Sequence, residues 1–199
     1  MEETFTEIYE KNLWGNNNNN NYSGSSGHGS SIEYNKEYIK ILRKIIKDYS
    51  ISSVVDLGCG DFMFGKLIYD DLDIVYTGYD AYKKVCDYNS SQFSPDRYSF
   101  NHLDFFKERE FIIGADICIL KDVIQHWTLN DINIFLNYLT NSKKFKYILI
   151  VNCGNQMRDN TECKTGHFRP LSCFFDPLKK YNAQIVANYN TKEISIIKL

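Results

Sequence analysis

The hydrophobic and polar positions of this chain follow two spacings, one typical of strands and one typical of helices. Short apolar or alternating runs predict strands in seven segments: 53–57, 73–80, 97–104, 114–122, 146–152, 183–190 and 192–199. Helices are expected at 61–70 and 130–140, with a helical or turn segment at 81–90. Strands that alternate with helices predict a doubly wound α/β fold with a mostly parallel sheet. The last two strands are separated by only a few residues, so we expect an antiparallel C-terminal hairpin.

Residues 1–31 precede this pattern and are predicted to be irregular. They contain a low-complexity Asn tract at 16–21, which is typical of a solvated linker or loop expansion. The segment "FTEIYEKNLWG" ahead of the tract carries too much apolar surface to lie in water. Residues 32–49 place apolar side chains at three- and four-residue spacing, which predicts an amphipathic helix with Ser30 or Ser31 as its N-cap. We expect one domain over 1–199, with a helix and an α/β core from residue 32.

Composition and charge narrow the class of protein. The chain is 43% hydrophobic and has a formal net charge of −2, so nothing in the total indicates a nucleic-acid surface. It contains no apolar run long enough to span a membrane, and its acidic start does not resemble a signal peptide, so we expect a cytoplasmic protein. Six cysteines occur without any C-x-x-C pair, which favours reduced thiols over a metal site.

The stretch "VVDLGCGD" places a glycine turn directly after the first predicted strand. Gly58 and Gly60 allow a tight turn and a close approach of ligand to the backbone at the carboxyl end of that strand. A dinucleotide site would need a third glycine where Met63 stands, and a phosphate-binding loop would need a hydroxyl where Leu67 stands. Asp56 would repel phosphate but suits a cationic ligand. S-adenosylmethionine (SAM) is such a ligand, because it carries a sulfonium and an amino group and no phosphate.

This stretch resembles the first motif of class I SAM-dependent methyltransferases across eight consecutive positions. The resemblance implies a Rossmann-like fold and a SAM cofactor whose methionine end lies in the turn of Gly58 and Gly60. The segments I-Y-x-x-x-x-W-G, S-G-x-G-S and F-R-P-L are similar to those of a subset of small methyltransferases, so the match covers about residues 5–178. The Asn insertion separates two of these segments, and we expect it to bulge outward.

The resemblance also implies further cofactor residues at the ends of the next strands. Asp80 closes the second strand and would bind both ribose hydroxyls. Asp104 would lie near the adenine, with Phe105 available to pack on the purine. Lys121 and Asp122 would lie at the carboxyl end of the fourth strand and contribute backbone and side-chain groups near the amino acid moiety of the cofactor.

The acceptor side has fewer candidates. His126 is the first choice for a general base, because its ordinary pKa suits proton abstraction at neutral pH. The alternative is a structural role, in which His126 only caps, or packs against Trp127 and the cofactor. His167 and Arg169 in "GHFRPL" are further candidates, with Arg169 placed to clamp a carboxylate or phosphate or to pair with a surface acid.

We therefore predict a SAM-dependent methyltransferase that methylates an oxygen of a small or medium acceptor, such as a saccharide or secondary metabolite. The sequence "KDVI" stands where base-methylating enzymes have an Asn/Asp-Pro-Pro-aromatic motif, which argues against a nucleic-acid base as acceptor. One alternative is a non-catalytic partner that keeps the fold and activates another subunit. Another is a nicotinamide oxidoreductase.

Overall fold

The computed structural model describes residues 1–16, 22–154 and 159–199. The chain divides into two compact units, Met1–Ile112 and Ile113–Leu199. The single domain expected from the sequence stays a prediction. Apart from Asn16, the Asn tract that we expect to bulge outward lies outside the described residues.

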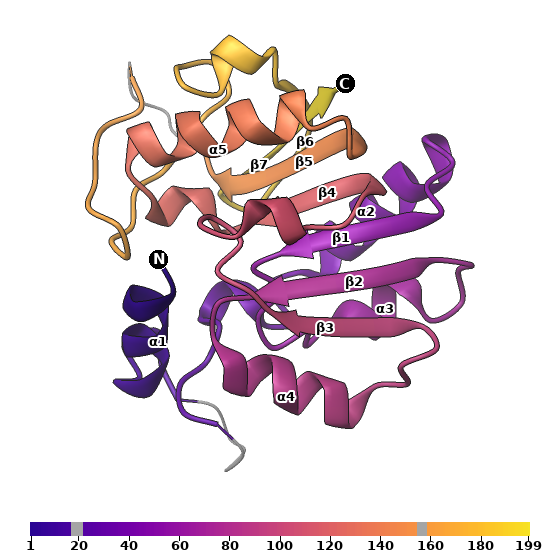
Figure 1. The fold of residues 1–199 in the computed structure, drawn as a ribbon. Helices are drawn as coiled ribbons and strands as arrows, with labels where there is room; N and C mark the ends of the chain where they lie inside the picture. Colours follow the sequence, from indigo (N-terminus) through magenta and orange to yellow (C-terminus); the bar gives the residue numbers. More distant parts are fainter. Residues whose placement is uncertain (17–21, 155–158) are drawn as a thin grey trace. The chain divides into compact units, whose positions relative to one another are not determined.

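The first unit contains three parallel strands in the order β3-β2-β1, with the register Asp56 opposite Gly78. Helix α4 packs against β2 and β3, and α2 packs against α3 (Figure 1). In chain order the elements are α1 (Glu2–Glu10), a 3-10 turn (His28–Ser30), α2 (Lys36–Asp48), β1 (Ser53–Leu57), α3 (Gly65–Tyr69), β2 (Val75–Asp80), α4 (Lys83–Gln92), β3 (Tyr98–His102) and a 3-10 turn (Arg109–Phe111).

The second unit contains four strands in the order β4-β5-β7-β6, of which β4 and β5 are parallel. Strand β7 is antiparallel to both β5 and β6, and its pairing with β6 is irregular between Ile185 and Ala187. In chain order the elements are β4 (Ala115–Lys121), a 3-10 turn η3 (Ile124–His126), α5 (Leu129–Asn141), β5 (Phe145–Cys153), a 3-10 turn (Lys179–Tyr181), β6 (Gln184–Tyr189) and β7 (Lys192–Lys198). The predicted mostly parallel seven-stranded sheet with an antiparallel C-terminal hairpin is confirmed.

Two predictions near the N-terminus are wrong. The segment predicted to be irregular begins with helix α1, which has two acidic residues in its first turn. Helix α2 starts at Lys36 rather than at residue 32, and its N-cap is Asn35. The Asn35 side-chain amide donates to the carbonyls of Gly29 and Ser31, both at 2.7 Å, and so fixes a turn ahead of the helix. The hydroxyl of Ser30 donates to the carbonyl of Gly27 at 2.7 Å and does not cap α2.

The core of each unit follows the apolar pattern of its strands. In β4, residues 116–120 are all buried, as expected for a strand covered on both faces. Helix α5 buries Ile132, Phe135, Leu136 and Leu139, which share one face at three- and four-residue spacing. In the described part of the chain, no helix combines the length and the apolar character needed to cross a membrane.

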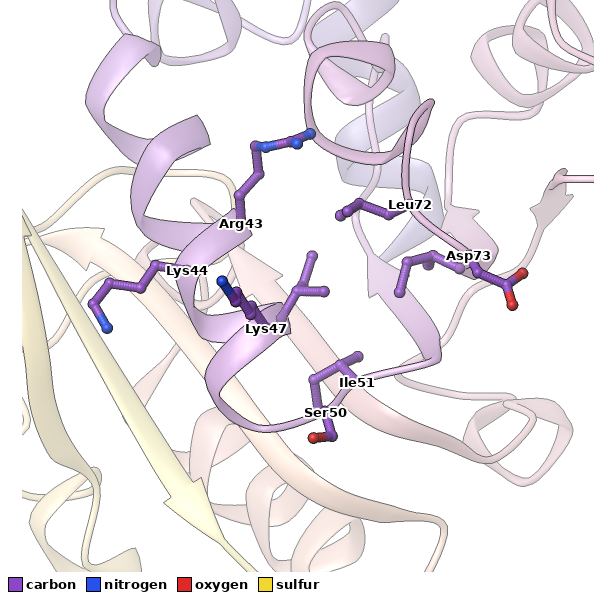
Figure 2. A pocket seen from close by; sticks show the side chains of 9 residues that line it. Arg43, Lys44, Lys47, Ser50, Ile51, Leu72 and Asp73 are labelled. Carbon is purple, nitrogen blue, oxygen red and sulfur yellow. The ribbon is translucent and has the colours of Figure 1, made fainter.

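An open cavity of about 530 Å³ lies in the first unit, at the amino ends of β1 and β2 (Figure 2). Its walls come from the end of α2 and from the residues that precede the two strands: Arg43, Lys44, Ile46, Lys47, Ser50, Ile51, Leu72, Asp73 and Ile74. The charge of Arg43 is already matched by a two-pronged pairing with Asp71, at 2.7 Å for each contact. The glycine turn follows β1 and therefore lies at the opposite end of that strand, so this cavity is separate from it.

Candidate cofactor and acceptor site

The turn after β1 is built from backbone conformations that favour glycine. Gly58 and Gly60 have φ angles of 82° and 53°, in the left-handed region that costs other residues energy. The backbone N–H groups of Gly58 and Cys59 both donate to the carbonyl of Tyr79, at 2.8 and 3.1 Å. The turn is thus tied to the end of β2.

Asp80 holds this turn with its side chain. One carboxylate oxygen accepts from the N–H of Gly60 at 3.0 Å, and the other accepts from the N–H of Tyr82 at 2.9 Å. The residue is 7% exposed, and burial raises the pKa of its carboxyl above the ordinary value. Each oxygen of a carboxylate has a second lone pair, so Asp80 can still accept from two vicinal hydroxyls. The geometry therefore fits a ribose diol.

Asn89 also stabilises the glycine turn, through a hydrogen bond to Gly60. This residue of α4 is fully buried, and its side-chain amide donates to the carbonyl of Gly60 at 2.8 Å. Its side-chain oxygen has no hydrogen-bond partner among the described residues. The role of Asn89 is not predictable from sequence, because nothing in the local pattern of α4 distinguishes it from a solvent-facing asparagine.

Asp56 has a different environment from the one expected of it. Its carboxylate accepts from the hydroxyl of Tyr76 on the neighbouring strand at 2.9 Å. Tyr76 is fully buried, so this contact fixes the Asp56 side chain within the first unit. A direct role of Asp56 toward the cofactor stays a prediction.

The N-terminal segment binds the glycine turn through Ser26. Its hydroxyl oxygen accepts from the N–H of Asp61 at 2.9 Å and shares a hydrogen bond of 2.8 Å with the hydroxyl of Tyr9. Its own N–H donates to the Asp61 carboxylate at 3.4 Å, and Ser30 donates to the same oxygen at 3.3 Å. Burial raises the pKa of Asp61. The segments S-G-x-G-S and D-L-G-C-G-D, which are distant in sequence, therefore form one local structure.

The replacement Gly60→Ala tests this packing. A Cβ at Gly60 would lie 2.4 Å from the Ser26 hydroxyl oxygen, at a φ angle unfavourable for alanine. We expect the free energy of unfolding to fall by about 1–3 kcal/mol and SAM affinity to fall at least about tenfold, because the turn and Ser26 cannot both keep their places. Denaturant unfolding and calorimetric titration measure the two effects. Gly154→Ala is the matched control, since its Cβ would meet only ordinary contacts of 3.6–4.0 Å. Equal behaviour of the two variants would contradict the proposed packing.

Asp104 anchors the start of α1. One carboxylate oxygen accepts from the Met1 ammonium at 3.2 Å and from the N–H of Glu2 at 3.1 Å, and the other accepts from the N–H of Lys107 at 3.2 Å. Burial would raise the pKa of Asp104, but these hydrogen bonds and the ammonium outweigh it and the pKa is lowered. Phe105, the expected adenine contact, is buried beside it at 6% exposure. Asp104 therefore lies against the first turn of α1.

Helix α1 is held in place at its other end by Tyr82. The ring of Tyr9 stacks on that of Tyr82 with 4.5 Å between centroids and 16° between planes. The hydroxyl of Tyr82 donates to Glu10 at 2.9 Å, and Glu10 also pairs with Lys84 at 2.6 Å. The helix thus lies beside the carboxyl ends of β2 and β3 (Figure 1).

In the second unit, Asp122 follows β4 with a φ angle of 60° and is paired with two lysines. Lys121 contacts one carboxylate oxygen at 2.8 Å, and the buried Lys192 contacts the other. Burial would raise the pKa of Asp122, but attraction to both lysines outweighs it and lowers the pKa. Lys192 also lies 3.1 Å from the thiol of Cys153. Sequence analysis missed Lys192, because its contact with Asp122 depends on the register of β7 on β5.

His126 lies next to this ion cluster in a buried position. Its Nδ1 is 3.2 Å from the carbonyl of His167, which assigns the ring proton to Nδ1. Its Nε2 is 3.4 Å from the side-chain nitrogen of Gln125, which itself donates to Asp122 at 3.0 Å. Burial lowers the pKa of the imidazole to about 4. His126 is therefore neutral at physiological pH.

The connection that carries His167 and Arg169 runs along η3. Gly166 donates to the carbonyl of His126 at 2.8 Å, and the backbone of Arg169 donates to that of Gln125 at 3.1 Å. His167 is exposed, whereas Arg169 is buried and donates through Nη1 to the carbonyl of Trp127 at 2.7 Å. The structure thus brings the three predicted acceptor-side residues together. Within the described ranges, no group of three or more His, Cys, Asp or Glu is arranged to hold a metal.

Comparison with known proteins agrees with this architecture. No family model matches the sequence, and no curated protein matches it. Among solved structures, a putative O-methyltransferase from Nostoc punctiforme matches with a TM-score of 0.64 and 10% identity, over 83% of this chain and 57% of that one. The chain has a methyltransferase fold. Human N-acetylserotonin methyltransferase in complex with SAM matches with a TM-score of 0.60 and 16% identity, over 85% of this chain and 57% of that one.

A smaller protein with the methyltransferase fold is matched over its whole length. The methyltransferase domain of bacterial CtHen1 has a TM-score of 0.62 and 15% identity, over 83% of this chain and 100% of that one. The present chain spans a little over half the length of the larger methyltransferases.

Proposed function

We propose that this protein is a SAM-dependent methyltransferase that transfers a methyl group to an oxygen of a small or medium molecule, with a saccharide or secondary metabolite as the preferred class. The observation that carries the proposal is the glycine turn held by the buried carboxylate of Asp80, which still has lone pairs for a ribose diol. The SAM complex of a structural neighbour supports the choice of cofactor.

The first unit supplies most of the residues proposed to hold SAM. Gly58 and Gly60 would present the backbone to its methionine end, and Asp80 would accept from both ribose hydroxyls. Asp104 and Phe105 are proposed for the adenine, beside the first turn of α1. From the second unit, we propose Lys121 and Asp122 for the amino acid moiety.

Methyl transfer makes few chemical demands on the protein. When bound, SAM supplies a methyl carbon already activated by the sulfonium. The chain must align the acceptor oxygen with that carbon and remove its proton. His126 is the proposed proton acceptor, with His167 and Arg169 on the acceptor side. Burial lowers the pKa of His126 to about 4, so the imidazole is neutral at pH 7 but is a weaker base than the ordinary histidine expected from the sequence.

Calorimetric titration with SAM, followed by an assay for methyl transfer across a broad acceptor panel, tests the proposal. Binding in the micromolar range together with transfer to an oxygen supports it. SAM binding without transfer to any acceptor favours the non-catalytic partner instead. Thermal stabilisation by NAD(H) and not by SAM would favour an oxidoreductase.

The replacement His126→Ala should lower kcat by roughly 10²–10⁴-fold and leave SAM affinity unchanged. The wild-type kcat should not titrate with His126 between pH 6 and 8, because the imidazole protonates only near pH 4. A pH–rate profile and calorimetry measure both effects. His28→Ala, which alters an exposed histidine of the first unit, is the control. A wild-type rate in His126→Ala would rule out the histidine as the base.

A further inference from the structure

Positive charge gathers around η3 in the second unit. Lys121 and Lys192 share the single carboxylate of Asp122. The guanidinium of Arg169 donates to the Trp127 carbonyl and to the thiol of Cys163 at 3.0 Å, but it makes no ion pair within the described ranges. Asp122 is shared by two lysines, and Glu162 attracts the guanidinium of Arg169 without forming an ion pair with it in the described part of the chain. Gln125 connects the two groups, since its side chain contacts Asp122 and its carbonyl accepts from Arg169.

Arg169 has donors that the described residues leave unused. It is 3% exposed, and its Nε and Nη2 atoms are buried without a hydrogen-bond partner in the parts of the chain that the structure describes. These two atoms form the edge of a guanidinium that binds a carboxylate or phosphate in a two-pronged manner. A buried charge whose donors face no acceptor is unfavourable, so the arrangement calls for an anion.

The neighbouring acids make no hydrogen bond to the Nε/Nη2 edge of Arg169 within the described residues. Glu162 is exposed, and its carboxylate accepts from the N–H groups of Leu129 and Cys163 at 3.0 and 2.9 Å. Glu193 follows Lys192 on β7, so its side chain points to the other face of the strand. There it accepts from Ser172 and from the N–H of Cys173, both at 2.7 Å. Neither carboxylate bonds the guanidinium edge in the described part of the chain, although Glu162 attracts Arg169 electrostatically.

We propose that the methyl acceptor carries a carboxylate or phosphate group, which binds the Nε/Nη2 edge of Arg169 in the positive field of Lys121 and Lys192. This inference rests on the proposed function. Arg169 is 3% exposed, so binding of the anion requires residues 163–171 to move away from η3.

The test uses small aromatic probes and the full chain. Benzoate, phenyl phosphate and the neutral benzamide are titrated by calorimetry in the presence of S-adenosylhomocysteine, whose own binding is measured separately. We expect one of the two anions to bind at least about tenfold more tightly than benzamide, and the stronger of the two to identify the acidic group. Equal affinity for benzoate, phenyl phosphate and benzamide would overturn the proposal.

Variants of Arg169 and Lys121 test whether the anion binds at the guanidinium of Arg169. Arg169→Lys keeps the charge but loses the two-pronged edge, so anion affinity should fall at least about tenfold while S-adenosylhomocysteine affinity stays within about twofold. Lys121→Met should weaken the anion by about three- to tenfold at a concentration of S-adenosylhomocysteine that saturates this variant. That affinity is measured first, because Lys121 is also proposed for the cofactor, and this variant carries the test if Arg169→Lys does not fold. The control is Lys146→Met, which removes an equal charge in the same unit, from an exposed lysine paired with the buried Asp116. Undiminished anion binding in both site variants would overturn the proposal. Failure of S-adenosylhomocysteine to bind would instead count against the proposed function. The anion titration would still show whether Arg169 binds an acidic group, because the two affinities are measured separately.

Discussion

Replacing Asp80 with asparagine is expected to weaken SAM binding by about 100-fold or more. The asparagine amide would point a donor at the N–H of either Gly60 or Tyr82, and it would lose acceptor capacity toward the ribose. Asparagine keeps one acceptor oxygen, so one charge-assisted hydrogen bond to the ribose is lost and the other is weakened. Hydrogen bonds to a charged acceptor contribute about 1.5–3 kcal/mol each, and the two changes together reach the roughly 2.7 kcal/mol that a 100-fold change requires. Asp80→Ala should show an effect at least as large.

Calorimetric titration with SAM and with S-adenosylhomocysteine measures this effect. The control is Asp87→Asn, which alters an exposed carboxylate of α4 that pairs with Lys83. Circular dichroism shows whether each variant is folded. Full SAM affinity in a folded Asp80→Asn protein would contradict the assignment of Asp80 to the ribose.

The variant Lys192→Met is expected to lower the free energy of unfolding by about 2–4 kcal/mol, because it removes a 4%-exposed partner of Asp122. The effect stays below that of a fully orphaned charge because Lys121 remains. Denaturant unfolding measures it. Lys83→Met, at an ion pair with Asp87 that is exposed on both sides, should cost no more than about 1 kcal/mol. Equal decreases in the free energy of unfolding of the two variants would show that the buried ion cluster adds no stability beyond that of an exposed ion pair.

The pKa shifts of Asp122 and Lys192 determine how the destabilisation by Lys192→Met depends on pH. The folded-state pKa of Asp122 is lowered, so its contribution to stability is present above the unfolded value of about 3.9 and is lost as the pH falls through the folded value. The pKa of Lys192 is raised: burial opposes this shift, but Asp122 outweighs burial. Its contribution is therefore present below about pH 10.4 and is lost as the pH rises further. The difference between wild type and Lys192→Met should stay constant from about pH 5 to 9 and shrink in acid.

The strands after residue 53 are predictable from sequence because each apolar run is bounded by turn residues, and because residues 116–120 are buried as a continuous run. Helix α1 is harder to predict. Its apolar residues Phe5, Ile8 and Tyr9 do repeat at helical spacing, but the segment is short and bordered by a low-complexity tract. Its stability depends on distant partners, above all the stacking on Tyr82, which local propensity does not encode.

Some features of the candidate site can likewise be predicted from sequence, and others cannot. The position of Asp80 beside the glycine turn follows from the strand–helix–strand spacing, and the structure places it there. The contact of Lys192 with Asp122 spans seventy residues and requires the β5–β7 register, so the sequence contains no local sign of it. The low pKa of His126 likewise results from burial that only the folded chain creates.

The position of the two tryptophans gives each unit its own optical reporter. The chain contains two, and Trp14 belongs to the first unit while Trp127 belongs to the second. Trp14 lies 6.0 Å from the ring of Tyr9, the residue that bonds Ser26 over the glycine turn. Trp127 is 1% exposed and packs against Phe135. Emission from single-tryptophan variants therefore follows events at the cofactor turn and at the acceptor side as two distinguishable signals.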